Sequence, residues 1–510
     1  MTNRTHIRVI RGALIGALAF LTAGTACAAG GAESGAEADA QVVEVAIAGE
    51  PDTLDPHATS GTLTFQVLRN VYDTLVVPNQ EGRIEAALAT SWETSEDELE
   101  WTFTLREGVE FHDGSEMTSA DVQATFERIL ADDSGSPWKP EFSSISRIST
   151  PDRYTVVFEL DRPYAPLLSS LASGWGAILP AELIEAGHDF GNEPVGTGPF
   201  RVTDWIRDNR IQLERHDAYW MEGAPRVDRV DFNIVTEPSV QVQGLISGDL
   251  HIIDTVLPGD IETIRQAAGA ELYRQLTAIV LVMAMNTNRA PLDQPAVRQA
   301  INHAIDKQAV LDVAYTGGEV VGTFMDSQSP YYVDFTDMYP YDPGRARELL
   351  AEANVGDDVT LDLVIPQNYE FHVRAAEMYN AMLTEVGLDT SIRLVDWSTW
   401  ISDVYRNTRY DLTVIGHTGK LDPDGRLNGE FDYTNWEHPR AEELIEQARR
   451  ESDFETRRRL YGEVLEIMAR EVPFVYLGSP YLYVGLREEV GGFEMDPTLD
   501  TYDFRRLTLE

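Results

Sequence analysis

The chain has 510 residues, of which 43% are hydrophobic, so it can form two or three buried cores. Its 85 acidic residues outnumber 40 basic ones, giving a formal net charge of −45. A surface of that sign repels phosphate backbones, which argues against nucleic acid as a partner.

The first 27 residues follow the order of a secretory signal: a positive region, a short apolar run and small residues. The apolar run Gly12–Ala23 is too short to cross a bilayer comfortably. Cys27, the only cysteine, resembles the lipidated residue of a bacterial lipobox, although Gly24 stands where leucine is usual. We expect lipidation at Cys27 and no disulfide. An ordinary signal with cleavage nearby is the alternative.

Residues 28–41 are small, acidic or polar and cannot bury enough apolar surface to fold, so they are interpreted as a flexible tether. No later apolar stretch approaches 18 residues, and no second membrane segment is expected.

The first half of the folded part is rich in strands that alternate apolar and polar residues. The predicted strands are Val43–Ile47, Trp101–Leu105, Tyr154–Leu160, Phe200–Val202, Ile211–Arg215, Val230–Val235 and, as a long apolar run without alternation, Ile279–Met285. The predicted helices are Phe65–Val71, a segment from Thr118 or Ser119 to about Leu130, and Ser239–Ser247. We expect Trp101, Phe103 and Leu105 to face a core.

The second half alternates helices and strands, which favours an α/β unit with a mainly parallel sheet. The predicted helices are Pro295–Val313, Pro343–Ala353, Phe371–Val386, His438–Arg450 and Phe454–Arg470. The predicted strands are Leu361–Ile365, Ser391–Val395, Leu412–Ile415 and Val472–Leu477, of which the last is expected to return to the first lobe.

The best boundaries lie near Asn286–Pro291 and Gly478–Pro480. If the chain passes from one lobe to the other at both points, the sequence of the second lobe is inserted within that of the first. Two such connections form a hinge.

Signatures of catalysis are absent from the sequence: it has no Gly-x-Ser-x-Gly elbow, Walker loop or His-Glu-x-x-His helix. Gly196-Thr197-Gly198 precedes a strand rather than a helix, so it is interpreted as a turn and not as a phosphate loop. The ten histidines show no metal-ligand spacing on a helix. The sequence therefore predicts no enzyme, no metal and no cofactor.

Six groups of residues, in order along the chain, resemble bacterial extracellular solute-binding proteins of family 5, the peptide/nickel-binding group. They are EPDTLDP (50–56) with VYDTLV (71–76), LATSW to TSADV (88–122), PVGTGPF (194–200) with Tyr219-Trp220, Asn286 with VRQAI and AIDK (297–307), the segment from Tyr341-Asp342-Pro343 to Leu350, and Tyr410-Asp411 with DPD (422–424).

The resemblance implies a two-lobed α/β fold of the periplasmic-binding-protein type II, with an extra subdomain in the first lobe and a two-crossover hinge. The expected limits are 42–285 for lobe I, with the subdomain at about 78–195, 286–477 for lobe II, and 478–510 returning to lobe I. The resemblance also implies delivery of the ligand to ABC importer permease subunits. Together with the signal and Cys27, it leads us to expect a monomer at the cell surface or in the periplasm, held to the membrane by its lipid anchor alone.

Dipeptide-binding members of this family place an aspartate after a Gly-Trp-x-Gly string to bind the peptide amine. Here the matching string is Gly416–Lys420, with Lys420 in place of the aspartate and His417 in place of the tryptophan. A cation at that position would repel an amine and attract an anion. The loop 366–368 also lacks the arginine of those members. Candidate ligand contacts are Thr59, Ser60, Trp175, Gln367, Trp397, Trp400, His417 and Lys420.

The predicted function is a transport receptor that captures a solute without changing it. An oligopeptide or peptide-like ligand is the first hypothesis. An oligosaccharide, an anionic metabolite or a metal chelate is the alternative ligand, and a secreted hydrolase is the remote alternative.

Overall fold

The computed structural model describes residues 40–510, except 316, 357–358, 419–420, 428, 430–431 and 497–500. The signal segment with Cys27 and the predicted ligand contact Lys420 therefore lie outside the described residues.

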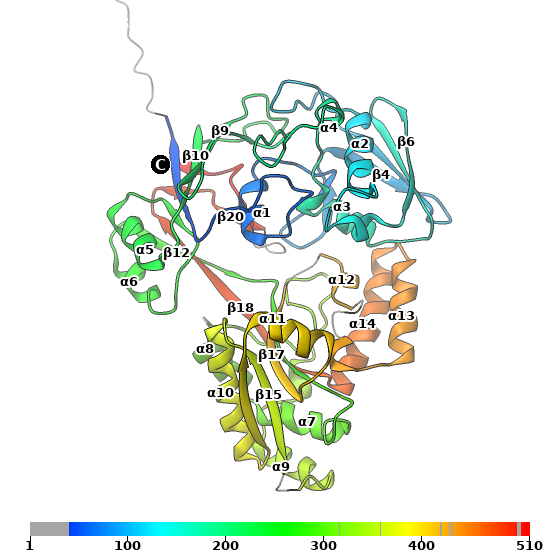
Figure 1. Cartoon of the computed structure of the whole chain (residues 1–510), viewed down its shortest axis with the longest axis vertical. Coiled ribbons are helices and arrows are strands. Elements are labelled where there is room, and N and C mark those ends of the chain that lie inside the picture. Colours follow the sequence, from blue (N-terminus) through cyan, green and yellow to red (C-terminus); the bar gives the residue numbers. More distant parts are fainter. Residues whose placement is uncertain are drawn as a thin grey trace, which may run out of the picture. The chain divides into compact units, whose positions relative to one another are not determined.

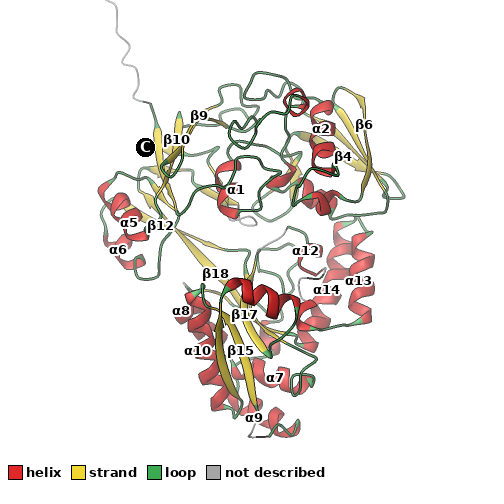
Figure 2. Ribbon diagram, viewed as in Figure 1, coloured by secondary structure: helices red, strands yellow, loops and turns green. Residues whose placement is uncertain are grey.

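One hydrogen-bonded path of strands runs through the molecule in the order β16-β15-β17-β13-β18-β11-β1-β10-β9-β8, with β12 and β14 pairing to β18 (Figures 1 and 2). These strands are β1 (Val42–Ile47), β8 (Phe200–Ile206), β9 (Arg210–Arg215), β10 (Arg229–Ile234), β11 (Ile252–Ile253), β12 (Ala270–Leu276), β13 (Val280–Met285), β14 (Gly318–Glu319), β15 (Thr360–Pro366), β16 (Asp389–Val395), β17 (Leu412–His417) and β18 (Phe474–Arg487).

Strand β18 joins the two halves of this path. Its first residues pair with β13 from Phe474 to Gly478, and residues 481–487 pair with β12. We name β13, β15, β16 and β17 with their helices lobe II. Lobe I contains β1, β8, β9, β10, β11 and β12. The two connections between the lobes are β18 itself and residues 277–279, between β12 and β13.

The crossing before lobe II differs from the predicted boundary at Asn286. Strand β13 pairs with β17 and β18 and lies inside the lobe II sheet. Its alternate residues enter two different cores: Leu281, Met283 and Met285 face one, and Val280, Val282 and Ala284 the other. A strand buried on both faces is continuously apolar, so the apolar run marks the start of lobe II rather than the end of lobe I.

The lobe II helices cover both faces of its sheet. They are α7 (Pro295–Ala304), α8 (Lys307–Ala314), α9 (Pro343–Glu352), α10 (Glu370–Glu385), α11 (Trp397–Thr399), the π-helical η4 (Trp400–Arg406), α12 (Asp424–Leu427), α13 (Pro439–Arg449), α14 (Phe454–Glu471) and the short η3 (Thr336–Met338) and η5 (Asp432–Thr434). Strands β15, β16 and β17 are mutually parallel as predicted, but β13 and β18 run antiparallel to their neighbours.

The single helix predicted over Pro295–Val313 is two helices. Helix α7 ends at Ala304, and Asp306 begins α8 by accepting a hydrogen bond from the Ala309 amide at 3.0 Å. An aspartate at this position competes with the helical backbone and favours an N-cap.

Lobe I carries a four-stranded antiparallel sheet in the order β4-β5-β7-β6, packed against α2. We name this part the subdomain: β4 (Ala89–Thr94), β5 (Glu100–Leu105), α2 (Ser119–Leu130), η1 (Lys139–Phe142), β6 (Ile145–Asp152), β7 (Thr155–Leu160), α3 (Leu167–Leu171) and η2 (Gly174–Gly176). Trp101, Phe103 and Leu105 are buried in its core, as predicted.

The remaining elements complete lobe I and its edges. They are α1 (Thr62–Leu68), β2 (Val76–Pro78), β3 (Ile84–Ala86), α4 (Ala181–Glu185), α5 (Pro238–Ser247), α6 (Ile261–Gln266), β19 (Val490–Gly491), β20 (Glu494–Asp496), β21 (Thr501–Asp503) and β22 (Thr508–Leu509). Among the helices that the structure describes, none combines the length and apolar character needed to cross a bilayer.

Candidate ligand-binding site

Three aromatic rings meet where the subdomain contacts α1. The rings of Trp138 and Trp175 stack with centroids 4.0 Å apart and planes 10° apart, and Phe65 contacts both edge-on. Trp138 also donates from Nε1 to the carbonyl of Thr59 at 2.7 Å. Trp138 therefore fixes two separate segments, the loop after His57 and the turn that carries Trp175. We name Phe65, Trp138 and Trp175 the lobe I aromatic group.

A second aromatic group lies in lobe II. Trp397 and Trp400 stack with centroids 5.1 Å apart, and Tyr369 contacts Trp397 edge-on. His417 stacks on Tyr433 and shares a 2.9 Å hydrogen bond between its Nε2 and the Tyr433 hydroxyl. Tyr369, Trp397 and His417 lie at or just after the ends of β15, β16 and β17, and in open α/β sheets such strand ends are where ligands bind.

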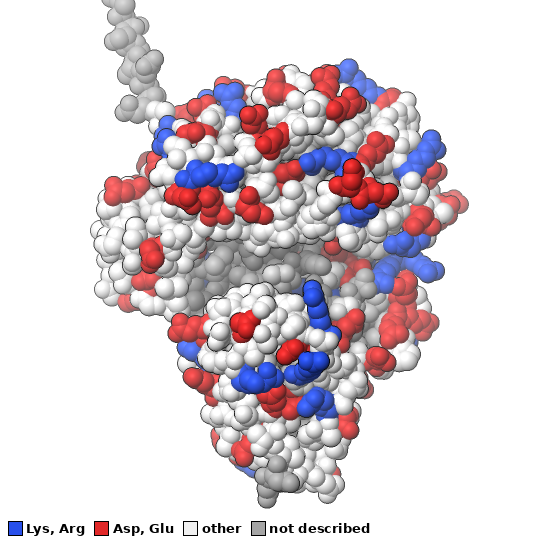
Figure 3. All heavy atoms as spheres, viewed as in Figure 1, with Lys and Arg blue, Asp and Glu red and all other residues white. Residues whose placement is uncertain are grey.

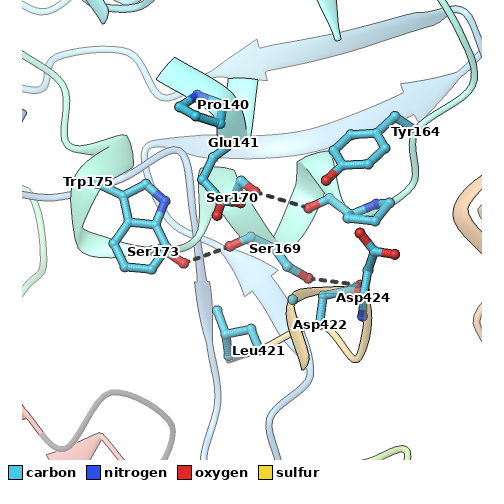
Figure 4. A pocket seen from close by; sticks show the side chains of 12 residues that line it. Pro140, Glu141, Tyr164, Ser169, Ser170, Ser173, Trp175, Leu421, Asp422 and Asp424 are labelled. Carbon is cyan, nitrogen blue, oxygen red and sulfur yellow. Dashed lines mark hydrogen bonds between the residues drawn. The ribbon is translucent and has the colours of Figure 1, made fainter. Parts of the chain in front are cut away.

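A cavity of about 230 Å³ lies between the subdomain and the loop after β17. Figure 4 shows the subdomain residues on one side and Leu421, Asp422 and Asp424 on the facing loop. The full lining is Pro140, Glu141, Tyr164, Pro166, Ser169, Ser170, Ser173, Trp175, Leu421, Asp422, Asp424 and Gly425. A hydrogen bond of 3.5 Å from Ser169 Oγ to Asp422 Oδ2 joins the two walls.

Two of the three carboxylates in the cavity are held by arginines of lobe II. Asp422 Oδ2 lies 2.8 Å from Arg457 Nη1, and Asp424 Oδ1 lies 2.5 Å from Arg449 Nε. Burial raises the pKa of Asp424 to about 6, against the opposing effect of Arg449. Burial also raises the pKa of Tyr164 well above its usual range. The third carboxylate, Glu141, accepts a hydrogen bond from Ser170 Oγ at 3.2 Å and has no ion pair within the described part of the chain.

A second cavity of about 270 Å³ adjoins the first and shares Ser169 and Leu421 with it. Its walls include Trp92 and Trp101 from the subdomain and Tyr331, Phe454 and Arg457 from lobe II. Ser169 and Leu421 therefore lie between the two cavities. Figure 3 shows a hollow across the visible face of the molecule, between the lobes.

The predicted lobe I contacts lie near one another. Trp175 is half-buried and lines the first cavity. Thr59 is 1% exposed, and its hydroxyl donates to Asp52 at 2.8 Å, so it shapes the loop. Ser60 is exposed beside it. Trp138 links Thr59 to Trp175, but neither Thr59 nor Ser60 lines the cavity.

The predicted lobe II contacts fall in or beside the second aromatic group. Gln367 and Trp397 are exposed. Trp400 is 3% exposed and donates from Nε1 to Thr413 at 2.9 Å, which places it in the core. His417 is buried against Tyr433, and none of these four residues lines the first cavity.

The sequence analysis missed Trp138, Glu141 and Tyr164. Trp138 and Glu141 lie on either side of Pro140 in a turn-rich stretch, and Tyr164 follows a strand end. Each becomes relevant only because the subdomain folds against the loop at 421–425, a tertiary contact without a local pattern. The described residues contain no cluster of histidine, cysteine, aspartate and glutamate that could hold a metal ion.

Comparison with known proteins gives consistent matches over nearly the whole chain. Residues 83–437 match the family model "Bacterial extracellular solute-binding proteins, family 5 Middle". The chain is 29% identical to di/tripeptide-binding protein 2 of Pseudomonas aeruginosa, over 94% of this chain and 97% of that protein.

Two solved structures resemble this chain in both fold and sequence. The protein AgaA from A. tumefaciens R10, in complex with agropinic acid, is 29% identical with a TM-score of 0.73, over 92% of this chain and 99% of that one. The protein DppA from Helicobacter pylori, in complex with the peptide STSA, is 26% identical with a TM-score of 0.72, over 92% of this chain and 98% of that one.

Proposed function

The chain belongs to family 5 of the bacterial extracellular solute-binding proteins, and from that premise we propose that it captures a short peptide between its lobes and delivers it to the permease of an ABC importer. The Pseudomonas relative is a di/tripeptide-binding protein, and the Helicobacter structure holds a peptide. The observation that carries the proposal is the cavity whose walls come from both lobes, at η1, α3 and η2 on one side and residues 421–425 on the other.

Capture by such a site depends on contacts with both lobes. A ligand shifts the lobes toward a closed arrangement only by the amount that it binds the closed state better than the open one. Trp175 and Glu141 on lobe I, and the loop after β17 on lobe II, offer the required pair of surfaces.

A thermal-shift and calorimetry screen tests the peptide ligand. The probes are dialanine, trialanine, maltotriose and citrate. A ligand at 100 times its Kd stabilises the folded state by about 2.7 kcal/mol, so a specific peptide should raise Tm clearly above the unliganded value. A rise with maltotriose or citrate and with neither peptide would overturn the peptide proposal.

An anionic metabolite is the second candidate ligand. The similar AgaA structure is in complex with agropinic acid, and Lys420 stands where dipeptide-binding members carry an aspartate. The citrate arm of the same screen addresses this candidate, and a calorimetric series of small dicarboxylates would extend it.

The protein acts outside the cytoplasmic membrane, as members of its family do. We propose that Cys27 is the lipid anchor and that the folded part is monomeric. Replacing Cys27 with serine should move the protein from the membrane fraction to the soluble fraction of fractionated cells. Light scattering after detergent extraction should give the mass of one chain.

A further inference from the structure

We propose that the cavity between the lobes contains a subsite for a cationic group, formed by the carboxylate of Glu141 and the exposed part of the Trp175 ring. The inference rests on the proposed function, since it names the chemistry that a captured ligand presents at this point. It assigns the recognition of positive charge to the subdomain of lobe I.

The charge pairing around the cavity leaves one position for a ligand cation. The carboxylates of Asp422 and Asp424 are engaged by Arg457 and Arg449, so a ligand would have to compete with an ion pair at either one. Glu141 has only the hydroxyl of Ser170 as a partner within the described residues, through Oε2. Its negative charge is therefore the one that a ligand can neutralise without breaking an existing pair.

The aromatic wall next to Glu141 suits the same ligand chemistry. Figure 4 shows Glu141, Ser170 and Trp175 as neighbours on the subdomain side of the cavity. Trp138 stacks on one face of Trp175 and Phe65 contacts it edge-on, and of these three rings only Trp175 lines the cavity. An ammonium or guanidinium group binds favourably over an indole ring, and more so when water is excluded.

Trp138 is the positioning residue of this subsite. The indole Nε1 of Trp175 is buried and makes no hydrogen bond, so the ring is held by packing alone. Its stacked neighbour in that packing is Trp138, with ring centroids 4.0 Å apart, and Trp138 is itself anchored by its hydrogen bond to the Thr59 carbonyl. The orientation of Trp175 toward the ligand thus depends on Trp138.

A cationic group can come from the amino terminus of a peptide or from a lysine or arginine side chain. The test uses trialanine, N-acetyl-trialanine and Ala-Arg-Ala, with affinities measured by calorimetry on the wild-type chain, Glu141→Gln and Glu185→Gln. Glu185 is exposed on α4 outside the cavity, and its substitution makes the same change in charge.

We expect Glu141→Gln to weaken binding of at least one cationic peptide by about 10- to 100-fold, the usual range for a charge-assisted hydrogen bond. Glu185→Gln should leave every affinity within about twofold. An effect on trialanine that disappears on acetylation identifies the amino terminus, and an effect confined to Ala-Arg-Ala identifies the side chain. Equal affinities in Glu141→Gln and wild type for all three peptides would overturn the subsite. Failure of every peptide to bind the wild type would instead overturn the proposed function.

Trp138→Phe and Trp138→Ala test the positioning role. Two stacked indoles couple their electronic transitions, so the wild type should show a circular dichroism couplet that both variants lose. Phenylalanine keeps a ring behind Trp175, so Trp138→Phe should bind the cationic peptide within about fivefold of wild type, and Trp138→Ala should lose more than tenfold. Wild-type affinity in folded Trp138→Ala would refute the role.

Discussion

His57 is a buried neutral base in the loop that leads to Thr59. It is 3% exposed, and its Nε2 lies 3.0 Å from the Ala177 carbonyl. Its Nδ1 lies 2.7 Å from an Arg128 nitrogen and accepts that hydrogen bond only while the ring is neutral. Burial, followed by the charge of Arg128, lowers the pKa of His57 to about 4, although Asp55 opposes the shift.

The lowered pKa of His57 predicts a loss of stability in acid. An unfolded histidine takes up a proton near pH 6.5, while the folded one resists protonation down to about pH 4. This contribution to stability is therefore complete above pH 6.5 and is lost as the pH falls toward 4. Between pH 7.5 and pH 5 it amounts to about 2 kcal/mol.

We expect His57→Gln to lower stability at pH 7.5, because the bond from Arg128 is disturbed, and to reduce the decrease in stability on going to pH 5 by about 2 kcal/mol. Urea unfolding of both proteins at the two pH values measures this difference. The same decrease in variant and wild type would contradict the assignment of a buried neutral imidazole.

At the scale of elements, strand β18 depends on a glycine at the point where it leaves lobe II. A Cβ on Gly478 would lie 2.4 Å from the Glu319 carbonyl oxygen and 2.7 Å from Leu311 Cδ1, both closer than atoms in real contacts. The first neighbour is backbone of β14 and cannot give way without breaking its pairing with β18.

Gly478→Ala should therefore destabilise the protein by about 1–3 kcal/mol, the usual cost of overpacking. Gly462 in the middle of α14 provides the matched control, because a Cβ there would lie 3.6 Å from Val333 in ordinary contact. Gly462→Ala should stabilise by about 0.5–1 kcal/mol through helix propensity. Chemical denaturation compares the two, and a neutral Gly478→Ala would contradict the tight crossing.

The elements also show which features could be predicted from sequence. The continuous apolar run of β13 indicates a strand buried on both faces, and the alternation in β5 indicates a half-buried strand; both strands are observed. The predicted Val472–Leu477 strand is the start of β18, which continues through Ser479 and Pro480 although these residues favour a turn. Pairing with β13, β14 and β12 overrides the local preference.

The candidate site was predicted less completely for the same reason. Trp175 could be recognised as an aromatic residue in a glycine-rich turn, and it does line the cavity. Glu141 and Trp138 lie near it only through folding of the subdomain, over more than 30 residues of chain. Trp400 has the same sequence signal as Trp397 but lies in the core, because the helical turn directs the two rings to different depths.

For the whole molecule, the formal net charge of −45 is the dominant electrostatic feature. Acidic side chains are spread over the face seen in Figure 3 rather than gathered in one patch. Dispersed like charges destabilise a compact state by mutual repulsion, and salt screens them over about 10 Å at 0.1 M.

We therefore expect Tm to rise by a few degrees when sodium chloride increases from 0.05 to 0.5 M. Scanning calorimetry measures the change, and potassium chloride at equal ionic strength should give the same shift if screening is the cause. A constant or falling Tm would show that the stabilising ion pairs outweigh the general repulsion.

The lobes also contact each other away from their covalent connections. We name these contacts the seam: Glu98 and Ala165 of lobe I against Ser452 and Arg449 of lobe II. Ser452 donates from its amide and hydroxyl to Glu98 Oε1 at 3.1 and 2.8 Å, and the Ala165 amide donates to the Arg449 carbonyl at 2.8 Å. Glu98 holds a positive φ of 58°, which is unfavourable for this residue type. We expect a motion of the lobes that encloses a ligand to keep this seam as well as the pairing of β18.

Cross-linking the seam tests this motion. Glu98→Cys and Ser452→Cys, with Cys27 replaced by serine, give two thiols that a short bismaleimide can join, since no other cysteine exists. If the seam is kept on closure, the cross-linked protein should bind trialanine within about threefold of the same protein treated with a monofunctional maleimide. That control carries the same substitutions and added groups without the bridge. A loss of more than tenfold on bridging alone would show that the seam must open before the ligand is enclosed, because a tether costs affinity only when it prevents the bound arrangement.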